Sequence, residues 1–251
     1  MIKRLPPPRS QDRDKTAAST RDAYDALCNN FRWQVDTHFN IAEVCCRRWA
    51  QADARTPDAT KRIAVHAHQP GAGGTFHTYS ELQQAADALS HRLVALGVQR
   101  GDRVAIVMPQ RFETAVAYMA VFQMGAVAMP LSMLFGPEAL EYRLQDSDAV
   151  LAICDESSIA NIHSVRSRCP ALCTVMAAGA AAGQGDVDYQ APAPTLVASR
   201  TSLPPGGAVP PRGGPSVERP WLAFTPVKTK ADDAAILIYT SGTTGPPKGA
   251  L

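Results

Sequence analysis

Residues 101–131 read GDRVAIVMPQRFETAVAYMAVFQMGAVAMPL, and this stretch decides the fold. Its first part, GDRVAIVMP, is rich in β-branched residues and predicts a buried strand that opens on a turn at Gly101-Asp102. Phe112 to Met124 then predicts a helix that ends at Gly125, and AVAMPL predicts a second short strand. A strand, a helix and a strand of these lengths are typical of a parallel sheet.

The segments that follow continue this alternation. Pro137 suits the first position of a helix that runs to about Gln145. AVLAIC at 149–154 predicts a strand, Ser157–Arg168 a helix, and LCTVM at 172–176 another strand. We therefore predict an α/β fold with layered, largely parallel sheets and flanking helices.

The segments before residue 101 predict two helices and a hairpin. Asn40 is placed to cap a helix that begins at the next residue. Ile63–Ala67 and the FHTYS segment predict the two strands of a hairpin. Ser80 is then expected to cap a helix whose apolar residues repeat at 3.6-residue spacing as far as Gly97, the expected C-terminal glycine.

Composition indicates a soluble globular protein, because 45% of the 251 residues are hydrophobic and 19% are charged. The formal net charge of +2 gives no reason to expect nucleic acid or an anionic membrane as a partner. No apolar run reaches the roughly 18 residues that a membrane span requires. The charged, proline-rich N-terminus lacks the apolar core of a signal peptide, and residues 1–30 are expected to form a disordered tail.

The six cysteines are interpreted as reduced thiols, with Cys154 and Cys173 in the core. None of them forms a CxxC pair, and no cluster of Cys and His has the spacing of zinc ligands. This cysteine usage predicts a cytoplasmic location.

Residues 177–226 differ from the rest of the chain, because Ala, Gly and Pro dominate and no period is visible. We predict that they form a linker or long loop without a packed layer. The expected organisation is thus an N-terminal α/β subdomain at 31–176, this linker, and the start of a second subdomain at 227–251.

The segment ILIYTSGTTGPPKGAL, residues 236–251, carries the chemistry. A short strand leads into a loop whose two glycines, Gly242 and Gly245, allow the backbone to approach a ligand closely. Hydroxyl donors and the cationic Lys248 suit a polyphosphate; the hydroxyls belong to Thr240, Ser241, Thr243 and Thr244. The loop is not a Walker A motif, because Lys248 precedes Gly249 where that motif has Ser or Thr. A polar surface turn is the alternative interpretation.

Other polar residues carry less weight as site residues. His66 and His68 alternate along one strand, but no third ligand lies nearby in sequence, so no metal site is predicted. Arg47-Arg48 and Arg111 are interpreted as solvated charges at helix ends. No Ser/His/Asp or Cys/His pattern identifies a catalytic residue, and the catalytic residues stay unknown.

The order of residues in YTSGTTGPPKG resembles the signature loop of the adenylate-forming superfamily, which includes acyl-CoA synthetases, nonribosomal peptide adenylation domains and luciferases. The 101–131 stretch is similar to that family's strand–helix–strand segment, and FHTYSELQQAADALSHRLVALGV to the helix before it. LFGPEALEYRLQDSDAVLAI resembles the acyl-CoA synthetase branch. The resemblance covers residues 40–176 and 228–251 and implies the partial N-terminal domain of an adenylate-forming enzyme.

The resemblance implies an ATP-dependent acid–CoA ligase. A carboxylate attacks the α-phosphate of ATP to give an acyl-adenylate and pyrophosphate, and coenzyme A then displaces AMP. The residues implied to hold the β- and γ-phosphates, together with Mg²⁺, are Thr240, Ser241, Gly242, Thr243, Thr244 and Gly245, with Lys248 assisting. The implied partners are a small-molecule carboxylic acid, ATP and CoA, in fatty-acid or related acid metabolism.

Two alternatives stay open. The acceptor could be the thiol of a carrier protein, although LFGPEALEYRL favours CoA. The 251-residue chain by itself could also be an inactive remnant, because the family's acyl pocket, adenine-binding residues, acidic Mg²⁺ ligand and C-terminal catalytic lysine map to no residue here. The strand after the loop would only begin at Ala250-Leu251, and without it we expect weak phosphate affinity.

Overall fold

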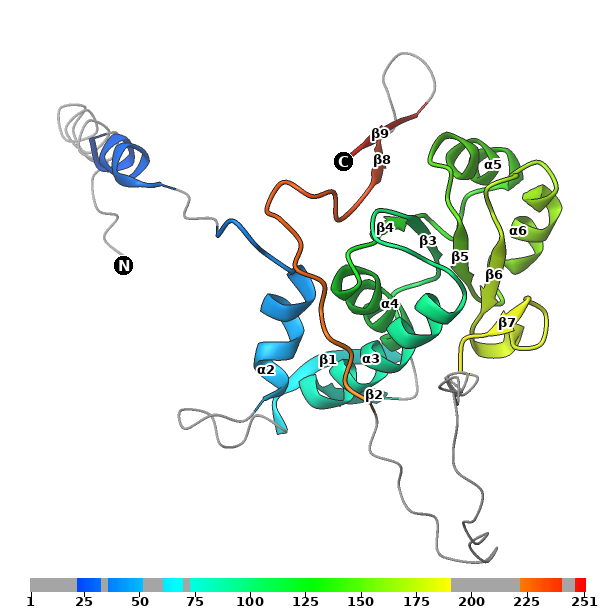
Figure 1. Ribbon diagram of the computed structural model, residues 1–251, viewed down its shortest axis with the longest axis horizontal. Coiled ribbons are helices and arrows are strands. Elements are labelled where there is room, and N and C mark those ends of the chain that lie inside the picture. Colours follow the sequence, from blue (N-terminus) through cyan, green and yellow to red (C-terminus); the bar gives the residue numbers. More distant parts are fainter. Residues whose placement is uncertain (1–21, 33–35, 52–60, 70–72, 191–221, 241–246) are drawn as a thin grey trace, which may run out of the picture. The chain divides into compact units, whose positions relative to one another are not determined.

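The computed structural model describes residues 22–32, 36–51, 61–69, 73–190, 222–240 and 247–251 (Figure 1). The chain divides into two compact units, Met1–Asp36 and Thr37–Leu251. Within the first unit, residues 22–30 are helical and exposed, and the disordered tail expected at 1–30 stays a prediction.

A five-stranded parallel sheet with the order β4-β3-β5-β6-β7 forms the centre of the second unit. Its strands are β3 (Arg103–Val107), β4 (Val127–Pro130), β5 (Leu151–Cys154), β6 (Thr174–Ala177) and β7 (Val187–Asp188). The predicted α/β class and parallel pairing are confirmed. The strands are nearly continuous apolar runs because helices cover both faces of the sheet.

Alternate residues of each strand enter two different apolar clusters. Val104 and Ile106 of β3 face the cluster that includes α3 (Tyr79–Ala95) and α4 (Phe112–Gln123). Ala105 and Val107 face the cluster that includes α5 (Pro137–Asp146) and α6 (Ile159–Arg166). The sheet is therefore the middle layer of three (Figure 1).

The hairpin and the helix before the sheet form as predicted, apart from one cap. β1 (Ile63–Gln69) pairs antiparallel with β2 (Gly73–Thr78), which leads directly into α3. The N-cap is Thr78, not Ser80: the Glu81 N–H donates to Thr78 Oγ1 (3.2 Å), and the Thr78 N–H donates to Glu81 Oε2 (2.7 Å). At the other end Gly97 adopts a φ of 89°, which suits the glycine after a helix.

Residues 41–50 are helical and include a π-helical turn, η1 (Glu43–Arg47), followed by α2 (Arg48–Ala50). Asn40 caps this helix as predicted, since its Oδ1 accepts from the Ala42 N–H at 3.1 Å. The same side chain donates from Nδ2 to the carbonyls of Phe122 and Val227, both at 3.0 Å. Asn40 therefore also joins the helix to two distant segments.

The predicted linker begins later than expected. Residues 179–181 form the short helix η3 (Gly179–Ala181), β7 adds a fifth strand to the sheet, and Tyr189 is buried. The boundary at 177 is therefore wrong, and residues 191–221 of the predicted linker lie outside the described residues. Whether 227–251 begins a second subdomain, separate from one at 31–176, stays a prediction.

Residues 222–240, which we name the return segment, run beside helix 41–50 and α4 toward the outer edge of β4 (orange in Figure 1). The Val227 N–H donates to the Gln123 carbonyl at 2.8 Å, and the Phe39 N–H donates to the Thr229 carbonyl at 2.9 Å. The segment ends in β8 (Ile238–Thr240), which pairs with β9 (Lys248–Ala250).

All six cysteines are free thiols, and their burial corrects one expectation. Cys154 is buried as predicted, whereas Cys173 is exposed. Cys46 and Cys169 are buried in the two apolar clusters. Burial raises the pKa of the Cys46 thiol to about 12, and also that of Cys154, so both stay protonated near neutral pH.

Candidate functional site: the base of the glycine-rich loop

The β8–β9 hairpin brings the two ends of the predicted phosphate-binding loop together. Three residue pairs face each other across the antiparallel ladder: Ile238 with Ala250, Tyr239 with Gly249, and Thr240 with Lys248. The second strand begins at Lys248, earlier than the expected Ala250, so these strands pair within the chain itself. Thr240 and Lys248 are exposed at the mouth of the hairpin.

The structure therefore places two of the predicted site residues opposite each other. The hydroxyl side chain of Thr240 lies where the loop leaves β8, and the ammonium group of Lys248 lies where the loop enters β9. The remaining predicted site residues lie outside the described residues; they are Ser241, Gly242, Thr243, Thr244 and Gly245.

The residues just before β8 reach the central sheet at an isolated parallel bridge between Ala128 and Ile236. The Ala128 N–H donates to the Ala235 carbonyl, and the Leu237 N–H donates back to the Ala128 carbonyl, both at 2.9 Å. The loop is thereby carried at the outer edge of β4.

Helix α5 holds both strands at the base of the loop. Tyr142 donates its hydroxyl to the Pro247 carbonyl at 3.0 Å, directly before Lys248. The Tyr239 hydroxyl donates to Asp146 Oδ2 at 2.7 Å. Desolvation and the Asp146 carboxylate raise the pKa of Tyr239, so this phenol remains a donor across the physiological range. Tyr142 and Asp146 lie four residues apart and therefore on one face of α5. The sequence shows this spacing, but it does not show that the β8–β9 hairpin is the contact partner.

Arg143 of the same helix adds a buried cation beside the hairpin. Its guanidinium lies over the Phe135 ring at 4.1 Å from the centroid, and 5.6 Å from that of Tyr239. Its Nη1 donates to the Ala139 carbonyl at 2.7 Å. Stacking of this kind rigidifies the α5 surface that the hairpin contacts.

A cavity of about 550 Å³ lies between the hairpin and the amino-terminal ends of β3 and β4. Both of its lining cations contact carboxylates, since Arg100 pairs with Asp233 and Arg103 lies 3.9 Å from Asp148, and Asp146 adds a third carboxylate. Within the described residues, this lining therefore offers an anionic ligand no uncompensated cation.

The opposite, carboxyl-terminal edge of the sheet carries an ion cluster that the sequence interpretation missed. Arg111 pairs with Glu113 at 2.9 Å, with the buried Asp155 at 3.4 Å, and with Glu156 at 3.7 Å. The hydrogen bond to Glu113 raises the pKa of Arg111. Arg111 is thus not a solvated helix-end charge; it neutralises carboxylates that follow β5.

The histidines of the hairpin take part in ring contacts. His66 stacks on Phe76 at 4.3 Å, and His77 stacks on Phe112 at 3.8 Å between centroids. Across the described part of the chain, no group of three His, Cys, Asp or Glu side chains is arranged to hold a metal ion. Among the helices of that same part, none is long and apolar enough to cross a bilayer.

The sequence matches known proteins over most of its length. The profile of the AMP-binding enzyme family matches residues 49–251. An acetyl-coenzyme A synthetase of Streptomyces coelicolor is 30% identical over 228 residues, which are 88% of this chain and 32% of that protein. A long-chain fatty-acid–CoA ligase of Mycobacterium bovis is 33% identical over 173 residues, 68% of this chain and 25% of that protein.

Solved structures agree in fold. An acyl-CoA synthetase from Brucella canis superposes with a TM-score of 0.61 at 22% identity, covering 90% of this chain and 37% of that one. An anthranilate CoA ligase in complex with anthranoyl-AMP gives a TM-score of 0.62 at 20% identity, covering 86% and 35%. The chain spans about a third of these proteins. Because the family profile covers well over half of the sequence and ends on the paired strands of the loop, the chain belongs to the AMP-binding enzyme family.

Proposed function

We propose that this chain is the N-terminal part of an AMP-forming acid–CoA ligase and that the loop between β8 and β9 binds the polyphosphate of ATP. The observation that carries the proposal is the pairing of Thr240 with Lys248 at the mouth of a hairpin whose intervening sequence is rich in glycine and hydroxyl residues. Family membership and the names of its relatives support the same reaction.

The paired strands suit this role because they fix where the loop begins and ends. Thr240 and Lys248 lie directly across the ladder, so a hydroxyl donor and a cation approach the same ligand from opposite strands. We assign the donors between them to the β- and γ-phosphates; these residues are Ser241, Gly242, Thr243, Thr244 and Gly245. Lys248 neutralises charge on the departing pyrophosphate.

The proposed reaction has two steps. A carboxylate oxygen of the acid forms a bond to the α-phosphorus, the bond between that phosphorus and the bridging oxygen of the β-phosphate breaks, and pyrophosphate leaves with the electron pair. The sulfur of CoA then bonds to the acyl carbon, AMP leaves, and the thiol proton is released. Mg²⁺ bound with ATP would share the phosphate charge, and we assign it no ligand in this chain.

Support for a carboxylic acid substrate and for CoA as acceptor comes from the names of the relatives, an acetyl-coenzyme A synthetase and a long-chain fatty-acid–CoA ligase. CoA is the acceptor in each of these names. We propose CoA here as well, in a cytoplasmic protein, since its six free cysteines suit a reducing compartment.

The test compares two exposed lysines. Lys248→Ala removes the cation at the loop, whereas Lys228→Ala removes an exposed lysine of the return segment and serves as the control. We expect Lys248→Ala to reduce acid-dependent exchange of labelled pyrophosphate into ATP by about one hundredfold, since an electrostatic donor to the transition state is lost. Lys228→Ala should leave exchange unchanged.

The assay is run with a panel of short-chain, long-chain and aromatic acids, on the 251-residue chain and on any longer product of the same reading frame. No exchange with any acid in either protein would contradict the proposal. Exchange in the longer product alone would assign the activity to the whole protein and make this chain the inactive part of it. Thioester formation with a carrier protein but not with CoA would replace the proposed acceptor.

A further inference from the structure

Arg47 lies at the centre of a buried polar network between helix 41–50, α3 and α4. Its Nη2 donates to Asp87 Oδ1 at 2.8 Å, and Asp87 is completely buried. The same nitrogen contacts Gln123 Oε1 at 3.4 Å and donates to the Phe224 carbonyl at 2.5 Å. Arg47 is therefore not the solvated helix-end charge that its sequence position indicates.

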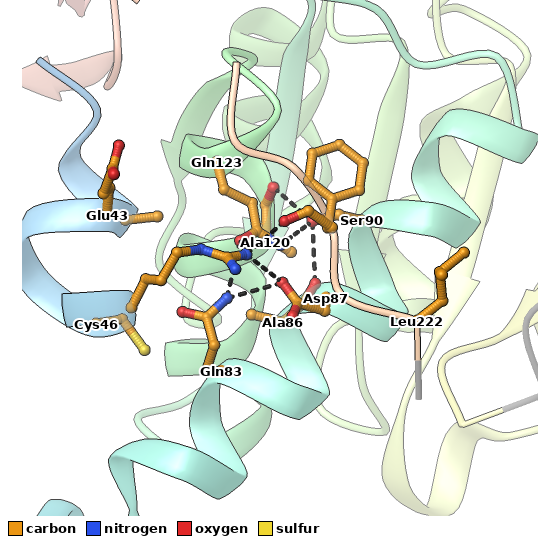
Figure 2. Close-up of polar contacts among 12 residues, drawn as sticks. Glu43, Cys46, Gln83, Ala86, Asp87, Ser90, Ala120, Gln123 and Leu222 are labelled. Carbon is orange, nitrogen blue, oxygen red and sulfur yellow. Dashed lines mark hydrogen bonds and ion pairs between the residues drawn. The ribbon is translucent and has the colours of Figure 1, made fainter. Parts of the chain in front are cut away.

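The partners of Arg47 are themselves fixed (Figure 2). Gln83 donates from Nε2 to Asp87 Oδ1 at 2.7 Å and to Gln123 Oε1 at 3.1 Å. Gln123 donates to Ser90 Oγ at 2.7 Å, and Ser90 in turn donates to the Ala120 carbonyl at 3.0 Å. These bonds join α3 to α4, so the network presents the Arg47 guanidinium at one defined place.

The outer partner of Arg47 belongs to the return segment. Along that segment, three carbonyls accept hydrogen bonds from side chains of the early part of the chain. Leu222 accepts from His91 at 3.1 Å, Phe224 accepts from Arg47, and Val227 accepts from Asn40. The Phe224 ring also meets His91 edge-on, at 5.1 Å between centroids. Arg47 is the one donor of the three whose own charge is paired with a buried carboxylate.

Stability alone gives a poor reason for this arrangement. A buried ion pair contributes little compared with apolar residues of similar size. In addition, Asp87 Oδ2 and Arg47 Nε are buried without a hydrogen-bond partner among the described residues, which costs free energy. What the pair provides instead is direction: the carboxylate of Asp87 holds the Arg47 guanidinium so that the same Nη2 also donates to the Phe224 carbonyl.

That carbonyl lies upstream of the predicted phosphate-binding loop. After Val227 the return segment reaches the sheet only at the Ala128–Ile236 bridge and then enters β8. β8 itself is also held by α5, through the bond of the Tyr239 hydroxyl to Asp146. Because the bonds to the sheet are few, the place of β8 depends on this contact together with those that hold the preceding residues.

We propose that Arg47 is a positioning residue for the loop: anchored by Asp87, it fixes the return segment at Phe224 and thereby sets where β8 and the Thr240–Lys248 pair stand. The positioning of β8 by Arg47 is a property of the fold alone, whereas the expected change in ATP affinity rests on the proposed function. Arg47 itself contacts no substrate in this assignment.

The experiment separates positioning from stability. In the double variant Arg47→Met, Asp87→Leu, both charges are replaced by apolar side chains, so the penalty of an unpaired buried charge is absent while the bond to Phe224 is lost. Arg168→Met, which breaks the exposed pair between Arg168 and Glu141, is the matched control. Hydrogen exchange of the Val227 and Leu237 amides, thermal unfolding, and calorimetric binding of Mg·ATP are measured on the full chain.

We expect the double variant to unfold at a temperature close to that of the parent, with exchange at Val227 and Leu237 about tenfold faster and that at Ile153 of β5 unchanged. Mg·ATP should bind about fivefold more weakly. Unchanged exchange at Val227 and Leu237 would overturn the proposal, whatever happens to ATP. Faster exchange in a chain whose parent form binds no ATP would support positioning, and the proposed function is then decided separately, by pyrophosphate exchange in the longer product.

A second variant tests the proposal if the double variant does not fold. Arg47→Lys keeps a cation opposite Asp87 but replaces the planar guanidinium, whose Nη2 bonds both Asp87 and Phe224, with a rotatable and strongly hydrated ammonium. Positioning by Arg47 predicts faster exchange at the same two amides in this variant, with Asp87 still paired. Exchange identical to that of the parent would contradict the proposal.

Discussion

The two ends of the return segment are held in different ways. Near Phe224 the segment is fixed by a charged side chain that is itself anchored to a completely buried carboxylate. Near Thr240 it is fixed by an exposed three-pair ladder and by the Tyr142 hydroxyl and the Asp146 carboxylate of α5. One end is thus held by a buried charged network and the other by contacts at the surface, where local stability is lower. Each end can be weakened separately, which makes the contrast testable.

The largest effect is expected from Arg47→Met at the buried end. Asp87 is left in the core without its cationic partner, which should lower the free energy of unfolding by about 3–5 kcal/mol. Urea denaturation gives this value. Arg100→Met, which removes the partly exposed pair with Asp233, is the control and should cost about 0–1 kcal/mol. Equal losses in the two variants would remove the distinction between the ends.

We expect the second-largest loss of stability from Gly125→Ala, because a methyl group added at this glycine would contact the return segment. Its φ is +71°, and an added Cβ would stand 3.2 Å from Thr229 Cγ2 and 3.5 Å from Val227 Cγ1. We expect a loss of about 1–3 kcal/mol from backbone strain and displacement of the segment. Gly136→Ala, at a φ of −71° with open space around it, is the matched control and should change stability little. Thermal unfolding distinguishes the two.

At the exposed end, Tyr142→Phe removes the hydrogen bond to the Pro247 carbonyl. The expected cost is about 1 kcal/mol, confined to the hairpin, so amides of β9 should exchange faster while the global unfolding midpoint stays in place. Tyr24→Phe, at an exposed tyrosine of the first unit, should change neither. A fall in the midpoint comparable with that of Arg47→Met would show that the exposed end is as important for stability as the buried one.

The smallest effect is a pH dependence midway along the segment. The Lys230 N–H donates to Asp233 Oδ2 at 2.7 Å, and this bond, helped by Arg100, lowers the pKa of Asp233 below its ordinary value of 3.8. The ionised form is favoured in the folded state, so the contribution is present above the ordinary pKa and is lost as the pH falls through the lowered one.

We expect the amide resonance of Lys230 to shift along a titration whose midpoint lies below 3.8. Asp233→Asn should abolish that titration. A midpoint at or above the ordinary value would mean that the middle of the return segment is not held in this way.

The sequence predicts most of the central unit because its signals are local. Apolar runs bounded by Gly101 and Gly125 give β3, α4 and β4 nearly to the residue. The cap of α3 shows how close the alternatives were: Thr78 and Ser80 both carry hydroxyls, and only Glu81, three residues after Thr78, completes the reciprocal box.

The errors lie where distant contacts override local preference. β7 is two residues long in an Ala- and Gly-rich stretch, and it exists because the edge of β6 offers backbone partners. Arg47 resembles a surface charge because its partner Asp87 is 40 residues away and Phe224 is 177 residues away. The loop's composition could be predicted, but the contacts of Tyr142 and Asp146 with its base could not, since nothing local links α5 to β8 or β9.

The long sequence separation between contacting residues also determines the order in which contacts form during synthesis. Neighbouring strands of the sheet join through short crossovers, whereas Asn40 meets Val227 only after 187 further residues, and Tyr142 meets Pro247 after 105. Loop-closure entropy makes such contacts late. The outer edge of β4 therefore stays unpaired on the emerging chain until the return segment arrives, and during that interval it is the edge most open to pairing with a neighbouring chain. The return segment, whose backbone bonds to Ala128 on both sides of Ile236, thus also covers part of an edge that would otherwise be open to another chain.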